Sequence, residues 1–302
     1  MPVSDIETAP PQRNIDPSDL AFNAVLEPLT SGPTATATAS EPVNAEGELS
    51  ARSTPSSVAL AAALNLSAED AEAMVRSAKP IPVARCQTRQ EAEMIANLIE
   101  SCGFNGRIVG DEELNLGREL TRARRITLDD DGIKVHASSS ALTIRNEDLK
   151  LLVMGALRRT RVDYSEAIIG ARGKDANLVD SAQFSSDEIL VDVYTSSLDS
   201  SFRVRAEAFD YSGLVEPLSF RAEANLKSAI EALIRRAPQT RVDSDFTRVR
   251  SLLSRSWPER SRNESRGIRR TGLSFRPVSQ QSILSDNSDQ FERYSRLMLL
   301  FA

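Results

Sequence analysis

Histidine and cysteine are almost missing from this 302-residue chain, which has one histidine, His136, and two cysteines, Cys86 and Cys102. A common zinc site needs about four clustered Cys or His ligands, and these residues lie too far apart in the sequence to supply them. A Cys–His nucleophile pair would need a cysteine beside His136, and the spacing does not place one there. We therefore expect no metal, no cofactor and no catalytic residue, and we expect that the protein is not an enzyme.

Aromatic residues make up 5% of the chain, so aliphatic side chains are expected to fill its cores. Lysine is also rare, with 5 lysines against 32 arginines. This excess of arginine is typical of a GC-rich genome. Selection for bidentate recognition of anions is the alternative, and it requires the arginines to cluster.

Long apolar runs are absent as well. No stretch approaches the roughly 20 apolar residues of a membrane-spanning helix. The first residues, MPVSDIETAPPQR, lack the basic and apolar regions of a secretory signal. We therefore expect a cytoplasmic protein with no membrane span and with reduced thiols.

The acidity of the chain is concentrated in residues 1–57, which hold eight acids and two arginines, while the other residues hold 35 acids and 35 bases. This segment is rich in Ser, Thr, Ala and Pro and is expected to be a disordered acidic tail. The apolar stretch DLAFNAVLEPL (19–29) within it is expected to be a transient helix, with a docking motif as the alternative. No strand is expected before residue 58.

Residues 58–110 are expected to form a small module of two helices, a strand, a third helix and a second strand. The apolar stretch SVALAAALN predicts a buried helix. Ser67 is typical of an N-cap for the following amphipathic helix. Pro80 ends that helix, because the residue before a proline avoids the α conformation.

The third helix of this module lies between the two cysteines. Thr88 and Glu91 form a capping box at its start, and Gly103 stands where a left-handed residue ends a helix. About 13 helical residues span roughly 20 Å, whereas a disulfide needs Cα atoms within about 7 Å. We therefore predict no bridge between Cys86 and Cys102 and no shared metal.

The stretch LNLSAEDAEAMVRSAKPIPVARCQTRQEAEMIANLIESCGFNGRIV resembles the C-terminal domain of the bacterial ribosomal stalk protein. The shared features are a two-helix hairpin, a Ser-Ala pair before a proline, a capped helix with EAE, and a glycine before the last strand. The resemblance covers about one sixth of the chain and implies a ligand- or protein-binding α/β module. In that family the second helix carries lysines that contact translation factors. The matching positions here are Glu69 and Glu72, so the translation role is not carried over.

Residues 118–240 are expected to form an antiparallel β-domain. RRITL and IKVHA pair as a hairpin around DDDG, with Gly132 supplying a positive φ, and ALTIRN adds a third strand. Residues 148–166 fit either a helical face or a long strand, and the RRTRVDY alternation favours the strand. DEILVDVYTS and SFRVRAEAFD form another antiparallel pair, and the amphipathic helix RAEANLKSAIEALIRRAP closes the domain.

This order of elements resembles the pleckstrin-homology-like architecture, which implies protein recognition. The predicted fold class is therefore α+β. A small α-α-β-α-β module is followed by an antiparallel β-domain closed by a C-terminal helix, and a disordered tail precedes both.

Residues 241–302 are expected to form an Arg-rich tail that ends in a short helix. Residues 245–276 hold nine arginines, three acids and no lysine. Arginines at this density bind phosphates, and Trp257 is available to stack on a base. The alternative is a solvated extended segment that packs on acidic surface. The candidate binding residues are Arg248, Arg250, Arg255, Arg260, Arg262, Arg266, Arg269, Arg270 and Trp257.

Two helices are expected within this tail. DSDFTRVRSLLSRSW predicts one that packs Phe246 and its helical neighbours against the preceding domain. SDNSDQFERYSRLMLLFA predicts a second with an apolar face that includes Phe291 and Tyr294. The second helix is expected to dock on its own domain, with oligomerisation or a partner or membrane-surface anchor as alternatives.

Together these features predict a non-enzymatic cytoplasmic adaptor or regulatory protein that acts through protein–protein recognition. The alternative is a nucleic-acid- or ribosome-associated factor that uses residues 245–276, whose binding would fall steeply with salt. An enzyme is a third and weaker interpretation. The sequence leaves the identity of the partner and the oligomeric state open.

Overall fold

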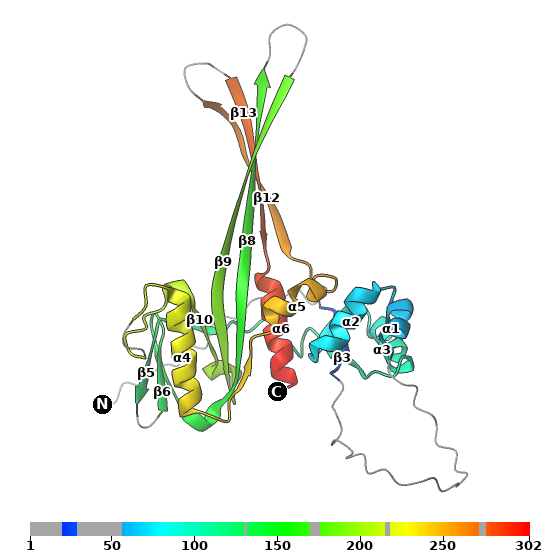
Figure 1. Cartoon of the computed structure of the whole chain (residues 1–302). Helices are drawn as coiled ribbons and strands as arrows, with labels where there is room; N and C mark the ends of the chain where they lie inside the picture. Colours follow the sequence, from blue (N-terminus) through cyan, green and yellow to red (C-terminus); the bar gives the residue numbers. More distant parts are fainter. Residues whose placement is uncertain (1–19, 29–55, 130–131, 170–175, 215–217, 272–275) are drawn as a thin grey trace, which may run out of the picture. The chain divides into compact units, whose positions relative to one another are not determined.

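A computed structural model describes residues 20–28, 56–129, 132–169, 176–214, 218–271 and 276–302, and its fold is mixed α+β as predicted (Figure 1). The chain divides into two compact units. The smaller unit contains the described part of Ile15–Asn115 together with Val249–Ser256. The larger unit contains Leu116–Arg248 and Trp257–Ala302.

The smaller unit packs three helices with a three-stranded sheet. Its helices are α1 (Ser57–Leu64), α2 (Ala68–Ser77) and α3 (Arg89–Ser101), and its strands are β1 (Phe22–Leu26), β2 (Ile81–Cys86) and β3 (Gly106–Gly110). The order of α1, α2, β2, α3 and β3 confirms the predicted helix–helix–strand–helix–strand order. The predicted caps are also present: Ser67 Oγ accepts from Asp70 N at 3.0 Å, and Thr88 and Glu91 form a capping box. Gly103 has a φ of 86°, which lets the chain leave α3 in a left-handed conformation.

We expected residues 19–29 to form a transient helix or a docking motif in a disordered tail. This was wrong, because Phe22–Leu26 form strand β1. This strand is central in the sheet, whose order is β2-β1-β3, and it is antiparallel to both neighbours. Ala24, Val25 and Leu26 are buried, and Asn23 donates to Val109 O at 3.1 Å and to Asp111 Oδ1 at 3.0 Å. The apolar run alone does not indicate a strand, because the strands that pair with it lie more than 50 residues further along the chain.

The larger unit contains two sheets. The three-stranded sheet consists of β5 (Arg125–Asp129), β6 (Gly132–His136) and β7 (Ala141–Ile144). The seven-stranded sheet has the order β12-β13-β8-β9-β10-β4, with β11 paired to β8. Its strands are β4 (Thr121–Arg122), β8 (Leu149–Ile169), β9 (Ala176–Thr195), β10 (Phe202–Arg205), β11 (Arg241–Asp243), β12 (Arg260–Thr271) and β13 (Arg276–Asp286).

Most predicted elements between residues 118 and 240 are confirmed. β5 and β6 form the predicted hairpin, in which Gly132 has a φ of 151°, and β10 pairs antiparallel to β9. Of the ambiguous segment 148–166, all but the first residue lies in β8, so the strand interpretation is confirmed. Helix α4 (Ala222–Arg236) buries Leu226, Ile230 and other apolar residues in one core with both sheets.

The β-domain continues beyond residue 240, where we expected an Arg-rich tail outside it. β12 pairs with β13, and β13 pairs with β8, so residues assigned to that tail are strands of the main sheet. Helix α4 is therefore not the last element of this unit. These residues form strands because β8 and β9 extend beyond the rest of the unit. β13 supplies backbone hydrogen-bond partners for the outer part of β8.

Helix α6 (Ser288–Leu300) docks on its own unit, as predicted, and its Phe291 and Tyr294 are fully buried. Phe291 packs edge-on against Phe246 of helix α5 (Phe246–Leu253), with ring centroids 5.0 Å apart. Tyr294 Oη donates to Asp243 Oδ1 at 2.7 Å. Burial and the charge of Asp243 raise the pKa of Tyr294, so its hydroxyl keeps the proton that it donates.

A buried polar cluster also fixes α6 to the sheet. Arg203 of β10 donates to both carboxylate oxygens of Asp192, at 2.5 and 2.8 Å. Ser295 Oγ of α6 donates to the same carboxylate at 2.7 Å and lies 2.8 Å from Tyr194 Oη. Because Asp192 is fully buried, these partners replace the water that its charge would otherwise need.

Candidate functional site

The outer halves of β8 and β9 join β12 and β13 in a four-stranded antiparallel arrangement, here called the ribbon (Figure 1). It comprises residues 159–169, 176–189, 260–271 and 276–286. β9 pairs with β10 only from Leu190 to Val193, so among the described residues no further strand lies beside the outer part of β9. The ribbon therefore exposes sheet surface that the body of the unit does not cover.

A groove of about 730 Å³ lies on the ribbon next to the start of α6. Its lining residues come from all four strands and are mainly arginines and hydroxyl-bearing residues. They are Arg159, Thr160, Arg161, Phe184, Ser185, Ser186, Arg260, Ser261, Arg262, Leu284, Ser285 and Asp286. We call this feature the ribbon groove.

The strand register explains why four arginines meet in the ribbon groove. Arg159 lies in one cross-strand row with Asp286 and Arg260. Arg161 lies in the next row of the same face, with Leu284 and Arg262. Neighbouring strands are about 4.8 Å apart, and alternate residues along a strand are about 7 Å apart. The four Cα atoms therefore mark a rectangle of roughly 10 by 7 Å.

Carboxylates hold these arginines in place. Arg161 contacts Asp163 at 2.6 Å, and Arg262 contacts Glu264 at 2.5 Å. Arg260 contacts Asp289 of α6 at 3.2 Å. These contacts use one nitrogen of each guanidinium, which carries five N–H donors in all. The arginines are therefore oriented and still have donors with which to bind a carboxylate or phosphate.

Glu188 forms the boundary between the ribbon groove and the body. It contacts Arg159 at 3.6 Å and is bound bidentately by Arg205. Burial alone would raise the pKa of Glu188, but the hydrogen bonds and charge of Arg205, with the charges of Arg159 and Arg122, hold the pKa below its ordinary value. Glu188 is therefore ionised at neutral pH and anchors Arg159.

The predicted binding residues whose side chains are described do not form one site. Arg260 and Arg262 line the ribbon groove. Arg248 pairs with Asp245 at 3.0 Å, and Arg255 donates to Asn65 O at 3.2 Å and to Leu64 O at the end of α1. Arg250 is not among the described residues that line the groove, and the side chains of Arg266, Arg269 and Arg270 lie outside the described residues.

Trp257 corrects the prediction of a stacking residue. It is 2% exposed, and its carbonyl accepts from Gln290 Nε2 of α6 at 2.9 Å. A base cannot stack on a ring that the protein already covers. The exposed aromatic residue at the groove is instead Phe184, which is 59% exposed.

Sequence reasoning missed Arg159, Arg161 and Phe184. The RRTRVDY alternation had predicted a strand, and its two-residue period places Arg159 and Arg161 on one face. Nothing in the sequence links that face to Arg260 and Arg262, which follow about 100 residues later. The two pairs of arginines come together because β13 lies between β8 and β12 and pairs with both strands.

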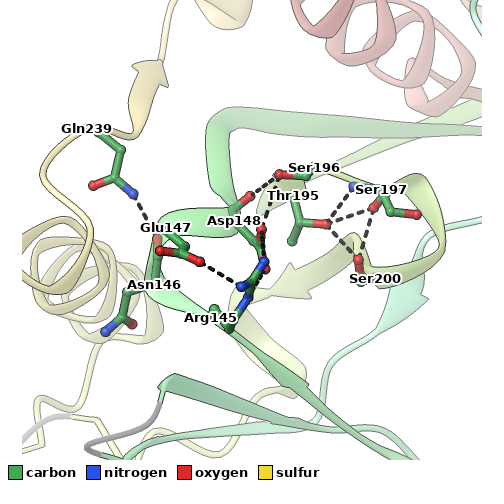
Figure 2. Close-up of polar contacts among 9 residues, drawn as sticks. All are labelled: Arg145, Asn146, Glu147, Asp148, Thr195, Ser196, Ser197, Ser200 and Gln239. Carbon is green, nitrogen blue, oxygen red and sulfur yellow. Dashed lines mark hydrogen bonds and ion pairs between the residues drawn. The ribbon is translucent and has the colours of Figure 1, made fainter.

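A second polar cluster joins the β7–β8 turn to the β9–β10 turn (Figure 2). Arg145 donates to both carboxylate oxygens of Asp148, at 3.0 and 3.2 Å, and contacts Glu147 at 2.8 Å. Ser196 N donates to Asp148 O at 2.9 Å, and Gln239 Nε2 donates to Asn146 O at 2.8 Å. The hydrogen bond and charge of Arg145 lower the pKa of Asp148.

These contacts stabilise the two turns and have a structural role. A hollow of 440 Å³ is lined by Arg145, Asn146, Glu147 and Gln239. The charged groups of the cluster contact residues of the same turns. Thr195 Oγ1 likewise donates to Ser197 O at 2.7 Å and lies 2.8 Å from Ser200 Oγ. We therefore place the candidate functional site in the ribbon groove.

The two thiols are free and buried in the structure. Burial and the nearby Glu91 raise the pKa of Cys86, which keeps the thiol protonated and unreactive. Within the described residues, no group of three or more His, Cys, Asp and Glu side chains could hold a metal ion. No described helix is long and apolar enough to cross a membrane.

Comparisons with protein-family models, with curated proteins and with solved structures found no match for this chain.

Proposed function

We propose that this chain is a non-enzymatic cytoplasmic adaptor or regulatory protein, and that it recognises a protein partner through the ribbon groove. The observation that carries the proposal is the set of four preoriented arginines on one face of an exposed sheet. Arginine is enriched at protein interfaces because its rigid fork binds carboxylates bidentately. The expected partner is therefore an extended segment that carries acidic side chains.

The composition of the groove fits a peptide better than a nucleic acid. Each groove arginine already contacts a carboxylate of this chain, which reduces the net positive field that phosphate backbones require. Hydroxyl groups and Phe184 lie beside the arginines and supply neutral contacts. The resemblances of residues 58–110 and 118–240 also imply protein recognition.

Affinity purification of the full chain, followed by titration of the purified partner, tests the proposal. The variant Arg159→Gln/Arg161→Gln removes two groove charges. Arg76→Gln/Arg89→Gln is the matched control, because these exposed arginines pair with acids on α2 and α3. We expect the groove variant to weaken partner binding about tenfold or more, equivalent to about 1.4 kcal/mol, and the control to bind as the wild type does.

Equal binding by the groove variant and the wild type would refute a role for the groove. Recovery of RNA in place of a protein, with steep loss at raised salt, would favour the nucleic-acid alternative.

A further inference from the structure

In the part of the chain that the structure describes, the ribbon has two open edges, and their side chains differ in charge. β12 forms one edge and presents Arg260, Arg262 and Glu264 within a largely exposed stretch. β9 forms the other edge up to Ile189. Its residues 181–187, SAQFSSD, are all exposed and include one charged side chain, Asp187.

Open strand edges present unpaired N–H and C=O groups that can pair with another chain. Charged side chains on an edge strand are a common protection against such pairing. β12 has this protection, while the described part of β9 has little of it. The open edge of β9 runs over residues 176–189 and is roughly 45 Å long at about 3.3 Å per residue. A long edge without protection is the place where a strand can be added.

We propose that β9 pairs antiparallel with β9 of a second copy of this chain, about a two-fold axis. The two ribbons then form one eight-stranded sheet in which both unprotected edges are buried. Its two outer edges are both β12, the charged edge. A peptide added to β9 would itself become a new open edge, whereas two-fold pairing closes the assembly. Because the charged edges remain outside and the uncharged edges pair, the occupant of the β9 edge is inferred to be a second copy of the chain.

The middle of the open edge lies at about residue 182, so we place the axis at Ala182. Pairing centred there uses the edge along its whole length and sets Ser181 opposite Gln183. It also sets Asp187 and Glu188 opposite residues 177 and 176, so these two acids do not face each other across the axis. The axis is perpendicular to the sheet, because directly opposed residues share a face.

This geometry has a consequence for binding. Both ribbon grooves lie on the same face of the joined sheet, and neither is covered by the pairing of edges. A partner with two acidic segments could then engage both grooves at once and gain avidity. The self-association itself goes beyond the proposed function and does not depend on it.

Cysteine cross-linking of the full chain tests the pairing. Directly opposed residues of an antiparallel pair have Cα atoms about 4.5–5.5 Å apart, within the range of a disulfide. Ala182→Cys is therefore expected to form a covalent dimer under mild oxidation, with Ser181→Cys and Gln183→Cys covering adjacent registers. Ser261→Cys on β12 is the matched control and should form no covalent dimer. The native thiols are buried and contribute little background.

The mass of the uncross-linked protein provides the second measurement. We expect wild-type protein to sediment as a dimer, and Ala182→Lys/Gln183→Lys to sediment as a monomer that still unfolds in a cooperative thermal transition. A wild-type monomer at concentrations up to about 100 µM would overturn the proposal. A dimer that survives the lysine variant, or that cross-links as readily through Ser261→Cys, would overturn it too. Arg159→Gln/Arg161→Gln should leave the dimer intact, which separates this test from that of the groove.

Discussion

The inner and outer halves of the β8–β9 hairpin differ in what surrounds them. In the inner half Leu149, Leu152, Val191 and Val193 belong to the core that α4 covers. In the outer half β9 exposes every residue from 181 to 187. One continuous hairpin is thus folded into the body at one end and offers sheet surface at the other.

Arginine–carboxylate pairs occur in both halves and have different effects. Asp192 in the inner half is fully buried and bound bidentately by Arg203. Arg159 in the outer half contacts Glu188 at 3.6 Å, and the Arg159 side chain is 52% exposed. Removing one partner of a buried pair leaves an uncompensated charge, whereas water replaces the partner of an exposed pair. The inner pair therefore contributes more to stability than the outer pair does.

Asp192→Ala should have the largest effect on stability. The variant leaves the Arg203 guanidinium without its carboxylate and removes the acceptor of Ser295. We expect the free energy of unfolding to fall by about 3–5 kcal/mol, measured by urea denaturation. Asp187→Ala is the control, because Asp187 forms an exposed pair with Arg158, and it should cost about 0–1 kcal/mol. Equal losses for the two variants would contradict the distinction between the halves.

Gly155→Ala should have the next largest effect. A Cβ at Gly155 would lie 2.3 Å from Phe291 Cε2 and 2.9 Å from Phe246 Cδ1. Both rings are buried, so the strain cannot relax into solvent. We expect a loss of about 1–3 kcal/mol and a weaker near-ultraviolet circular dichroism signal. At Gly110 the nearest atoms to such a Cβ are 3.6 Å away, so Gly110→Ala should fold with wild-type stability.

Local signals in the sequence predicted the local structure well. The Ser67 N-cap, the Thr88 capping box and the Gly103 helix end each depend on a few adjacent residues, and the structure contains all three. The β5–β6 hairpin was predicted for the same reason, since its turn and both its strands lie within 15 residues.

The strand pairings between distant segments could not be predicted from the sequence. β1 pairs with strands 55 or more residues away, and β13 joins β8 across more than 100 residues. An apolar run or an Arg-rich run carries no information about which distant strand will accept it. The ribbon groove consists of such pairings, so Arg260 and Arg262 could be listed from the sequence while Arg159 and Arg161 could not be joined to them.

Low pH should weaken the contacts of Glu188, which lies at the boundary between the two halves. The folded-state pKa of Glu188 is lowered from about 4.5, so its contribution to stability is present above that pH and is lost as the pH falls through the folded-state value. Glu188→Gln should cost about 1 kcal/mol at pH 7 and should show a shallower loss of stability below pH 4.5 than the wild type does. Urea denaturation at a series of pH values measures both. Parallel profiles for the two proteins would show that Glu188 does not contribute to the acid response.

Arg161→Gln should have the smallest effect on stability and so gives the clearest separation of the two halves. Its partner is Asp163, and the two side chains are 37% and 34% exposed, so water replaces the contact when it is lost. We expect the free energy of unfolding to change by less than about 0.5 kcal/mol, and a double-mutant cycle with Asp163→Asn to give a coupling of about 0.2–1 kcal/mol. A coupling as large as that of a buried pair would mean that the outer half is built for stability as the inner half is. A small coupling would agree with the proposal that this face serves recognition.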